Sequence, residues 1–302
     1  MTGSSPLVPT RFLIALTKHT RSALAAALPA RIQNEFLLTA ITADPETVSF
    51  ADAAGIDRIG IDIERIGKVD RQRHVPGARI SPHQLDELAA VTARVTRAEI
   101  FARLNPIHDG SRMEVEQALA LGARVLMLPY FTHPREVSRF VEMIGGRAIP
   151  VLLLETAEAV ARLPEIVNVP GVAEISVGLN DLHLSLGLSN IFDVVVSDVM
   201  DTIAKRVRGA GLRFGFGGVA RFGDCTLPVG PDLIYAQYAR LNATSAWLSR
   251  SFFAGLELRE MAGEVEIVRR RLSYWAGQPP SIWESRRAEL AVALEQLRIP
   301  AQ

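Results

Sequence analysis

The stretch that decides the fold is IPVLLLETAEAVARLPEIVNVPGVAEISVGLNDL, residues 149–182. It begins with an apolar run that ends at Glu155, continues through a segment of helical periodicity, and returns to a second apolar run at residues 173–178. A strand, a helix and a strand in this order are typical of a βαβ unit, in which the two strands are parallel members of one sheet. The stretch therefore predicts an α/β protein.

The same alternation of short apolar runs and amphipathic segments extends along most of the chain. The eight predicted strands cover residues 36–41, 57–63, 98–104, 124–130, 149–155, 173–178, 212–218 and 244–253. Eight strands alternating with helices over about 250 residues indicate a (β/α)₈ TIM barrel. An open, doubly wound sheet is the alternative that the pattern leaves open.

The chain divides into three predicted parts: an N-terminal helical extension (1–35), a barrel domain (36–255) and C-terminal helices (256–302). Charged residues such as Lys18 interrupt the apolar run of the first part, which favours an amphipathic helix on the outside of the fold over a membrane span or a signal peptide. The C-terminal helices exceed what a barrel requires. Their spare apolar faces predict packing on a neighbouring subunit, with capping of the barrel's own floor as the alternative.

Composition excludes some classes of partner. Of the 302 residues, 48% are hydrophobic, which is enough for a large buried core. The 33 basic and 33 acidic residues cancel, so no overall field favours nucleic acid or an anionic membrane. Cys225 is the only cysteine, so the chain has neither an intrachain disulfide nor a cysteine zinc cluster, and we expect a cytoplasmic protein.

Ionisable residues follow several of the predicted strands, at the end of a barrel where active sites form. Glu155 directly follows the run VLLL, and Asp181 follows the next strand. Burying an isolated carboxylate costs several kcal/mol, and a second one nearby increases the cost, so a cation is required between them. Oxygen ligands favour Mg²⁺ or Mn²⁺ over zinc. A structural interpretation stays open, in which Glu155 stabilises a helix N-terminus and Asp181 caps its own turn.

Arg103 lies near the end of the third predicted strand, where alternation points its side chain into the barrel. Its planar guanidinium is suited to holding a substrate carboxylate with two hydrogen bonds. The alternative is a structural ion pair with Glu64 or Glu155. Glu64 itself is a catalytic candidate, with a plainer role as a salt-bridge partner at the barrel mouth.

At this point several motifs resemble one known family. The run LLLETAEAVARLPEIVNVPGVAEISVGLNDLHLSLG (152–187) is similar to the signature of the HpcH/HpaI aldolase and citrate lyase family. The segments DRIGIDIERIGK (57–68), FARLNP (101–106) and GARVLMLPYFTHPREV (122–137) resemble its second, third and fourth strands. The resemblance implies a TIM barrel in which Glu155 and Asp181 hold a divalent metal, Mg²⁺ first, with Mn²⁺ or Co²⁺ as alternatives.

The resemblance also implies the chemistry. It predicts a lyase that makes or breaks a carbon–carbon bond beside a pyruvate-like enolate, with a 2-oxo acid and an aldehyde as substrates and Arg103 holding the pyruvoyl group. Backbone N–H groups around Gly178 and Asn180 are expected to complete the oxyanion site, and Thr156 to be a hydrogen-bonding neighbour or simply a helix start. The family likeness further predicts a homo-oligomer, such as a hexamer with exchanged C-terminal helices.

One position departs from the family pattern. Family aldolases often carry a histidine directly after the Asp-x-Glu motif, and citrate lyase-like members an acid, whereas this chain has Arg65. Proton transfer must then come from a metal-bound water or from another residue, for which His183 and His108 are the candidates, although a surface position is the commoner fate of a histidine. A β-hydroxyacyl-CoA lyase of the citryl or malyl type, and a non-catalytic barrel that kept its metal and anion pocket, are the alternative functions.

Basic residues supply candidate contacts for an anionic substrate tail. Arg65 precedes three more cations in the same long loop, Lys68, Arg71 and Arg73, and together they suit a phosphate, carboxylate or sugar acid. Arg221 follows the glycine-rich GFGG segment as a further anion contact. That segment ends a late strand and does not open a βαβ unit, so we reject a dinucleotide-binding fingerprint.

Overall fold

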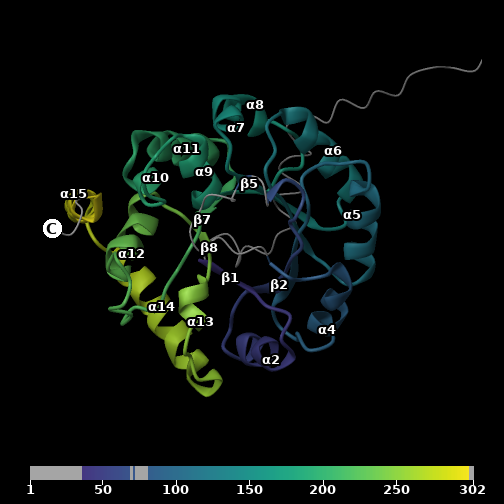
Figure 1. Ribbon diagram of the computed structural model, residues 1–302, viewed down its shortest axis with the longest axis horizontal. Helices are drawn as coiled ribbons and strands as arrows, with labels where there is room; N and C mark the ends of the chain where they lie inside the picture. Colours follow the sequence, from purple (N-terminus) through teal and green to yellow (C-terminus); the bar gives the residue numbers. More distant parts are fainter. Residues whose placement is uncertain (1–35, 69–70, 72–80, 299–302) are drawn as a thin grey trace, which may run out of the picture.

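The structure, a computed structural model, describes residues 36–68, 71 and 81–298. The predicted N-terminal helix of residues 1–35 lies outside the described residues. Within them, eight parallel strands form a closed barrel in chain order, and helices surround it (Figure 1). Leu38 of the first strand pairs with Ala246 of the last, and this closure confirms the TIM barrel and excludes the open sheet.

The strands of the barrel are short and apolar. They are β1 (Leu37–Ile41), β2 (Arg58–Asp62), β3 (Glu99–Arg103), β4 (Val125–Leu128), β5 (Ile149–Leu154), β6 (Glu174–Val177), β7 (Arg213–Phe216) and β8 (Ser245–Trp247). Nearly every strand residue is buried, because helices cover the outside of the barrel and side chains fill its inside.

Helices connect the strands and cover the barrel. The α-helices are α2 (Pro45–Ala53), α4 (Leu88–Thr92), α5 (Ser111–Ala120), α6 (Pro134–Ile144), α7 (Ala157–Ala161), α8 (Leu163–Ile166), α9 (Leu179–Ser185), α10 (Asp193–Val196), α11 (Asp198–Gly209), α12 (Pro231–Arg240), α13 (Arg250–Phe253), α14 (Met261–Ala276) and α15 (Pro280–Arg298). The 3₁₀ turns are η1 (Leu85–Glu87) and η2 (Leu258–Glu260). None of the described helices is long and apolar enough to cross a membrane.

The last predicted strand was too long. Residues 244–253 contain β8 only as far as Trp247, and the chain then turns into α13. The side chain of Ser249 accepts a hydrogen bond from the N–H of Phe252 at 3.3 Å, so this serine caps the N-terminus of the short helix. A local capping signal therefore ends the strand even though apolar residues continue beyond it.

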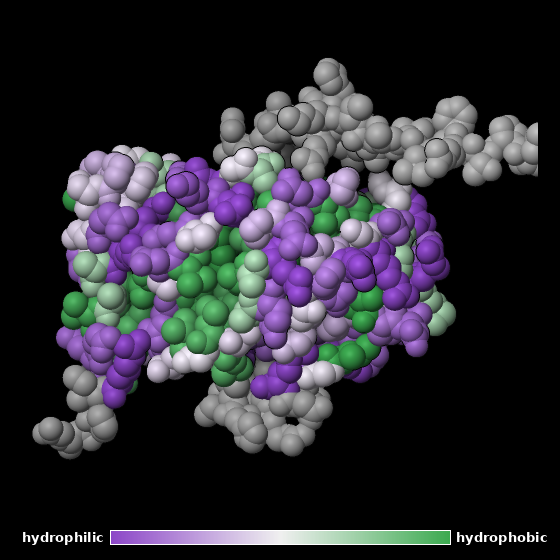
Figure 2. All heavy atoms as spheres, turned by 90° about the horizontal axis from the view of Figure 1, so that it is seen from above, coloured by the Kyte–Doolittle hydropathy of each residue, from purple (hydrophilic) through white to green (hydrophobic). Residues whose placement is uncertain are grey.

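The two C-terminal helices are present as predicted. In the described part of the chain, α14 packs against α12 and α2, and α15 packs against α12 and α10, at the outer edge of the ring of helices (Figure 1). Both helices therefore cover helices of their own barrel. Seen from the side that carries α7 and α8, hydrophilic residues cover most of the surface, and hydrophobic ones gather in a band near its centre (Figure 2).

The interior of the barrel is layered from floor to mouth. At the amino-terminal end of the strands, Arg58 donates a hydrogen bond to Glu174 at 2.8 Å, and Ser245 donates to the same carboxylate at 2.7 Å. An apolar layer follows, in which Phe101 meets the ring of Trp247 edge to face. Because side chains of a strand alternate, the residues two positions beyond this layer point into the barrel mouth.

Candidate active site

Four buried carboxylates and three cations meet at the carboxyl ends of β2, β3, β5 and β6. The carboxylates are Asp62, Glu64, Glu155 and Asp181, and the cations are Lys68, Arg71 and Arg103. We call these seven residues the mouth cluster. Each carboxylate residue is at most 5% exposed. The structure thus brings together Glu64, Glu155, Asp181 and Arg103, which the sequence analysis singled out at the ends of separate strands.

The guanidinium of Arg103 forms two hydrogen bonds with the carboxylate of Asp62. Its Nε and Nη2 donate to the two carboxylate oxygens at 2.8 and 2.6 Å, and its Nη1 lies 3.3 Å from Glu64. The register of the barrel explains the pair, because Asp62 and Arg103 are partners in the β2–β3 ladder. Burial favours the neutral form of Asp62, but the charge and hydrogen bonds of Arg103, the charge of Lys68 and the backbone N–H of Glu64 together outweigh it and lower the pKa of this carboxyl to about 2. The structural ion pair with Glu64 that the sequence analysis left open is therefore present, and Asp62 is a second partner that the sequence analysis did not name.

Glu64 is fully buried and is neutralised by two cations from the loop after β2. The Nζ of Lys68 lies 2.8 Å from one carboxylate oxygen, and Nη2 of Arg71 binds the other. Lys68 is itself only 4% exposed, and its Nζ also lies 3.6 Å from Asp62. These cations therefore turn into the barrel mouth, where they hold carboxylates, although the sequence analysis assigned them to a substrate tail.

Glu155 ends β5 and lies in a narrow space. One carboxylate oxygen accepts a hydrogen bond from the backbone N–H of Tyr130 at 2.9 Å. The other lies against Gly178, where a Cβ atom would come within 2.3 Å of it, so only glycine fits at this position. Tyr130 has a φ of 47°, a left-handed conformation that is strained for a tyrosine. The bond to Glu155 helps to hold Tyr130 in that conformation.

The charge around Glu155 is unfavourable to its ionised form. Burial raises its pKa well above the ordinary value of 4.5, and the negative charges of Glu64 and Asp181 raise it further. The positive charges of Arg103 and Lys68 oppose this shift but do not cancel it.

Asp181 lies in the first turn of the short helix α9, directly after β6, and not in a plain loop. Its carboxylate is 3.5 Å from Nε of Arg71. The guanidinium of Arg71 also covers the ring of Tyr130, with its central carbon 3.5 Å from the ring centre. Tyr130 therefore contacts two members of the mouth cluster: its backbone N–H binds Glu155, and its ring packs against Arg71.

These features fit a divalent cation. The carboxyl of Glu155 is buried beside the negative charges of Glu64 and Asp181, which raise its pKa, so added positive charge at this position would stabilise its ionised form. Within the described residues, no group of three or more His, Cys, Asp or Glu side chains forms a complete metal cage. Magnesium does not need one, since it commonly binds one or two carboxylates and keeps several water ligands.

Thr156 and His183 take part in local structure beside the cluster. The hydroxyl of Thr156 accepts from the N–H of Ala159 at 3.1 Å and donates to the carbonyl of Phe131 at 2.9 Å, so it caps α7, which is the plainer of its two predicted roles. His183 is buried, and its Nδ1 lies 3.1 Å from the carbonyl of Leu179 in the same helix. Asn180 is exposed on the first turn of α9.

The remaining candidates contact groups outside the cluster. His108 accepts from the N–H of Gly110 at 3.1 Å, and its Nε2 lies 3.1 Å from Glu114. Arg65 is exposed and donates from Nη2 to the carbonyls of residues 82 and 83 at 2.7 and 3.0 Å. Arg221 donates to the carbonyl of residue 254 at 2.6 Å. Their predicted roles toward a substrate stay predictions.

Two aromatic residues of the site were not singled out by the sequence analysis. Tyr130 was read only as the end of an apolar strand, and Trp247 as part of a longer one. Trp247 ends β8, and the guanidinium carbon of Arg103 lies 4.9 Å from its ring centre. Both residues are aromatic and can form hydrogen bonds; Trp247 is the last residue of β8, and Tyr130 follows the last residue of β4 by two positions. An aromatic residue of this kind at or just after the end of a barrel strand is the signal that could have marked them.

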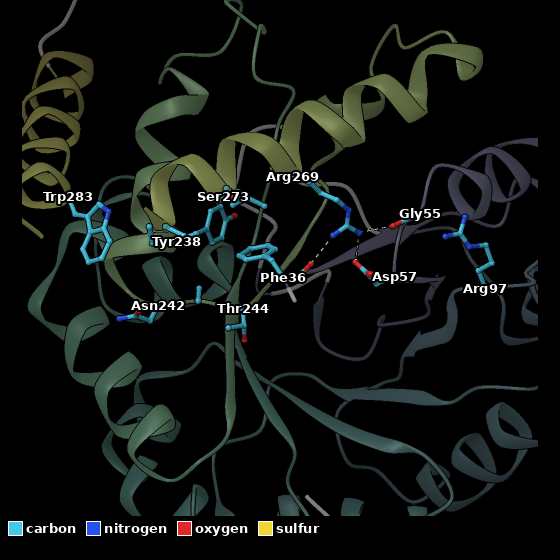
Figure 3. A pocket seen from close by; sticks show the side chains of 14 residues that line it. Phe36, Gly55, Asp57, Arg97, Tyr238, Asn242, Thr244, Arg269, Ser273 and Trp283 are labelled. Carbon is cyan, nitrogen blue, oxygen red and sulfur yellow. Dashed lines mark hydrogen bonds and ion pairs between the residues drawn. The ribbon is translucent and has the colours of Figure 1, made fainter. Parts of the chain in front are cut away.

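A large cavity lies at the opposite end of the barrel. It measures about 770 Å³ and is lined by residues that precede the strands, such as Phe36 and Asp57, and by α14. Arg269 reaches from α14 and donates to Asp57 at 2.8 Å and to the carbonyl of Gly55 at 2.6 Å (Figure 3). The geometry of TIM barrels places chemistry at the carboxyl ends of the strands, so we assign the candidate active site to the mouth cluster and not to this cavity.

The fold and the site define a TIM-barrel protein with an acidic, partly neutralised mouth. A comparison with protein-family models matches residues 36–219 to the HpcH/HpaI aldolase/citrate lyase family. The chain belongs to this family of aldolases and lyases, as the resemblance of its motifs predicted.

Individual relatives agree with this assignment. A hydroxypyruvate/pyruvate aldolase from Rhizorhabdus wittichii is 31% identical over 103 residues, which are 33% of this chain and 41% of that relative. This match therefore spans less than half the length of the curated relative. Its substrates and activity are accordingly not transferred to the chain by the match alone.

Solved structures share the fold. An HpcH/HpaI family protein from Burkholderia cenocepacia has a TM-score of 0.58 at 18% identity, covering 84% of this chain and 98% of that one. The citrate lyase β subunit from M. tuberculosis, complexed with oxaloacetate and magnesium, has a TM-score of 0.55 at 17% identity, covering 80% and 99%. At these identities the likeness shows the barrel architecture alone.

Proposed function

We propose that this chain is a divalent-metal-dependent lyase of the class II aldolase type, which makes or cleaves a carbon–carbon bond beside a pyruvate-like enolate. The observation that carries the proposal is the buried carboxylate of Glu155, which lies beside the negative charges of Glu64 and Asp181, so that burial and these charges raise its pKa. The family and the magnesium bound by the M. tuberculosis citrate lyase subunit support the same assignment. We propose a 2-oxo acid and an aldehyde as substrates.

Glu155 and Asp181 would hold the metal, with Mg²⁺ as the first choice and Mn²⁺ or Co²⁺ as alternatives. When bound, such a metal supplies Lewis-acid polarisation of the keto oxygen. Tyr130 and Gly178 fix the orientation of Glu155, through a hydrogen bond on one oxygen and close packing on the other. The absence of a Cβ atom at Gly178 leaves room for this carboxylate oxygen beside the backbone.

Arg103 is proposed to stabilise negative charge that develops on the substrate. Asp62 occupies its Nε and Nη2, which fixes the plane of the guanidinium. Nη1 points to the side of Glu64, at 3.3 Å. Positive charge that is held rigid in a buried site stabilises an enolate without reorganisation during the reaction. The backbone N–H groups near Gly178 and Asn180 are proposed to contribute further donors.

Two histidines are candidates for proton transfer. Arg65, which takes the place of the family's histidine or acid, directs its Nη2 to backbone carbonyls at 2.7 and 3.0 Å. His183 lies within the same short helix as Asp181, two residues further on. His183 is therefore the histidine that we place first for proton transfer, ahead of His108, whose Nε2 lies beside Glu114.

Exchange of the pyruvate methyl protons with solvent, followed by NMR, tests the proposal directly. We expect exchange with Mg²⁺, Mn²⁺ or Co²⁺ and its loss when EDTA is added, because enolate formation requires the metal. Absence of exchange with all three metals would contradict action on pyruvate. If exchange then occurs on a thioester donor, the β-hydroxyacyl-CoA lyase is the correct function, and if it occurs on neither, the barrel is a non-catalytic binding protein.

Metal binding is tested separately by calorimetry with Mn²⁺. Asp181→Asn and Glu155→Gln should each weaken binding at least about tenfold, since each removes a charged ligand. The matched control is Glu114→Gln, which removes a carboxylate that contacts Asn105 and His108. Unchanged Mn²⁺ affinity in both cluster variants would exclude these residues as ligands.

A further inference from the structure

Arg71 bridges two carboxylates of the mouth cluster that have different expected tasks. Its Nη2 binds Glu64, while its Nε lies 3.5 Å from Asp181, one of the two proposed metal ligands. The side chain is 12% exposed and packs over the ring of Tyr130. The guanidinium of Arg71 therefore lies beside the carboxylate of Asp181, which is a proposed metal ligand.

The two contacts of Arg71 differ in strength. The contact with Glu64 is a short hydrogen bond, whereas Nε is buried and donates no hydrogen bond within the described structure. A buried N–H group without an acceptor is unfavourable, because it has lost its hydrogen bonds to water without replacement. The attachment to Asp181 is therefore an ion pair without the hydrogen bond that would make it strong, and the Nε–H is available to a better acceptor.

We propose that Arg71 and the divalent metal compete for Asp181, and that metal binding leaves the Arg71 guanidinium to an oxyanion of the substrate, a carboxylate or a phosphate. The inference rests on the proposed function, because it takes Asp181 as a metal ligand. Two positive groups cannot both lie against one carboxylate without repelling each other, so the arrival of a divalent ion weakens the Arg71 contact. Glu64 and Tyr130 then hold the guanidinium at the barrel mouth.

The competition has two consequences. Metal alone should bind weakly, because it must replace an existing ion pair. An anionic substrate should strengthen metal binding, because it satisfies the Nε–H and compensates the positive charge that the metal adds. By thermodynamic linkage, metal should strengthen binding of the anion by the same factor. Arg71 is thus proposed to be a specificity-determining residue that couples metal and substrate.

Calorimetric titration of the full chain with Mn²⁺, with and without saturating pyruvate, tests the inference. The variants are Arg71→Gln and, as a matched control, Arg135→Gln, which removes one exposed positive charge from the start of α6. Without pyruvate, Arg71→Gln should bind Mn²⁺ about tenfold more tightly than the wild type, and Arg135→Gln should change the affinity less than about twofold. Pyruvate should tighten Mn²⁺ binding to the wild type several-fold more than to Arg71→Gln.

The outcomes separate this inference from the proposed function. Wild-type Mn²⁺ binding combined with equal or weaker binding by Arg71→Gln would overturn the competition and leave the metal site intact. Absence of Mn²⁺ binding by both proteins would overturn the metal site and the competition with it. Arg71→Lys keeps the charge but loses the planar fork, so it should bind with intermediate affinity. This second variant decides the question if Arg71→Gln does not fold.

Discussion

Replacing Glu155 with glutamine should stabilise the metal-free protein. Glu155 is 2% exposed, and burial with the nearby charges of Glu64 and Asp181 raises the pKa of its carboxyl well above 4.5. A neutral amide of the same shape removes the cost of the buried charge. Its oxygen still accepts from Tyr130, and its NH₂ group can donate to the neighbouring carboxylates.

The size of the effect depends on pH and follows from linkage. A carboxyl with a higher pKa in the folded than in the unfolded chain binds protons more tightly when folded, so folding stability falls as pH rises from about the unfolded value of 4.5 toward the folded one. At pH 8 the wild type bears more of this cost than at pH 4.5. One unit of pKa difference between the folded and unfolded chain corresponds to about 1.4 kcal/mol, so we expect a gain of about 1–2 kcal/mol.

The assay is urea and thermal unfolding of both proteins in EDTA at pH 4.5 and pH 8. At pH 8, Glu155→Gln should be about 1–2 kcal/mol more stable, which is a rise of a few degrees in Tm for a domain of this size. At pH 4.5 the difference should shrink. Added Mg²⁺ at about 100 times its Kd should stabilise the wild type by about 2.7 kcal/mol and the variant less. A variant that is less stable than the wild type in EDTA at pH 8 would refute the reasoning.

Two further predictions concern residues that support the site. Asp62→Asn removes the carboxylate that binds two nitrogen atoms of the Arg103 guanidinium, so it should lower the free energy of unfolding by about 3 kcal/mol. This is the lower end of the range for a broken buried pair, because Glu64 remains 3.3 Å from Arg103. Urea unfolding with an unchanged midpoint would contradict the pairing. Thr156→Ala removes the N-cap of α7 and should lower the free energy of unfolding by about 1 kcal/mol. The affinity for Mn²⁺, measured by calorimetry, should stay within about twofold of the wild type. A tenfold loss of affinity would instead indicate that the hydroxyl acts on the metal site.

The fold could be predicted because its signals are local. Each strand is a short apolar run, each connection carries helical periodicity, and eight repeats of this unit leave few topologies other than a closed barrel. The end of β8 was misplaced because Phe252 and Phe253 continue the apolar pattern, whereas the cap at Ser249 is a single hydrogen bond. Glu155 and Arg103 could also be located from the sequence. Each is a charged residue at the end of an apolar strand, where a buried charge is unfavourable, so the sequence itself marks them as functional candidates.

The pairing of charges was decided only by the tertiary structure. Asp62 and Arg103 are 41 residues apart, and the β2–β3 register makes them partners. Lys68 and Arg71 suit solvent, a substrate tail or a buried carboxylate equally well by residue type alone. The sequence by itself determined the barrel and the acids and arginine at its mouth, because both follow from local patterns. The folded chain determined which cation neutralises which acid, because this depends on distances between segments that only barrel closure brings together.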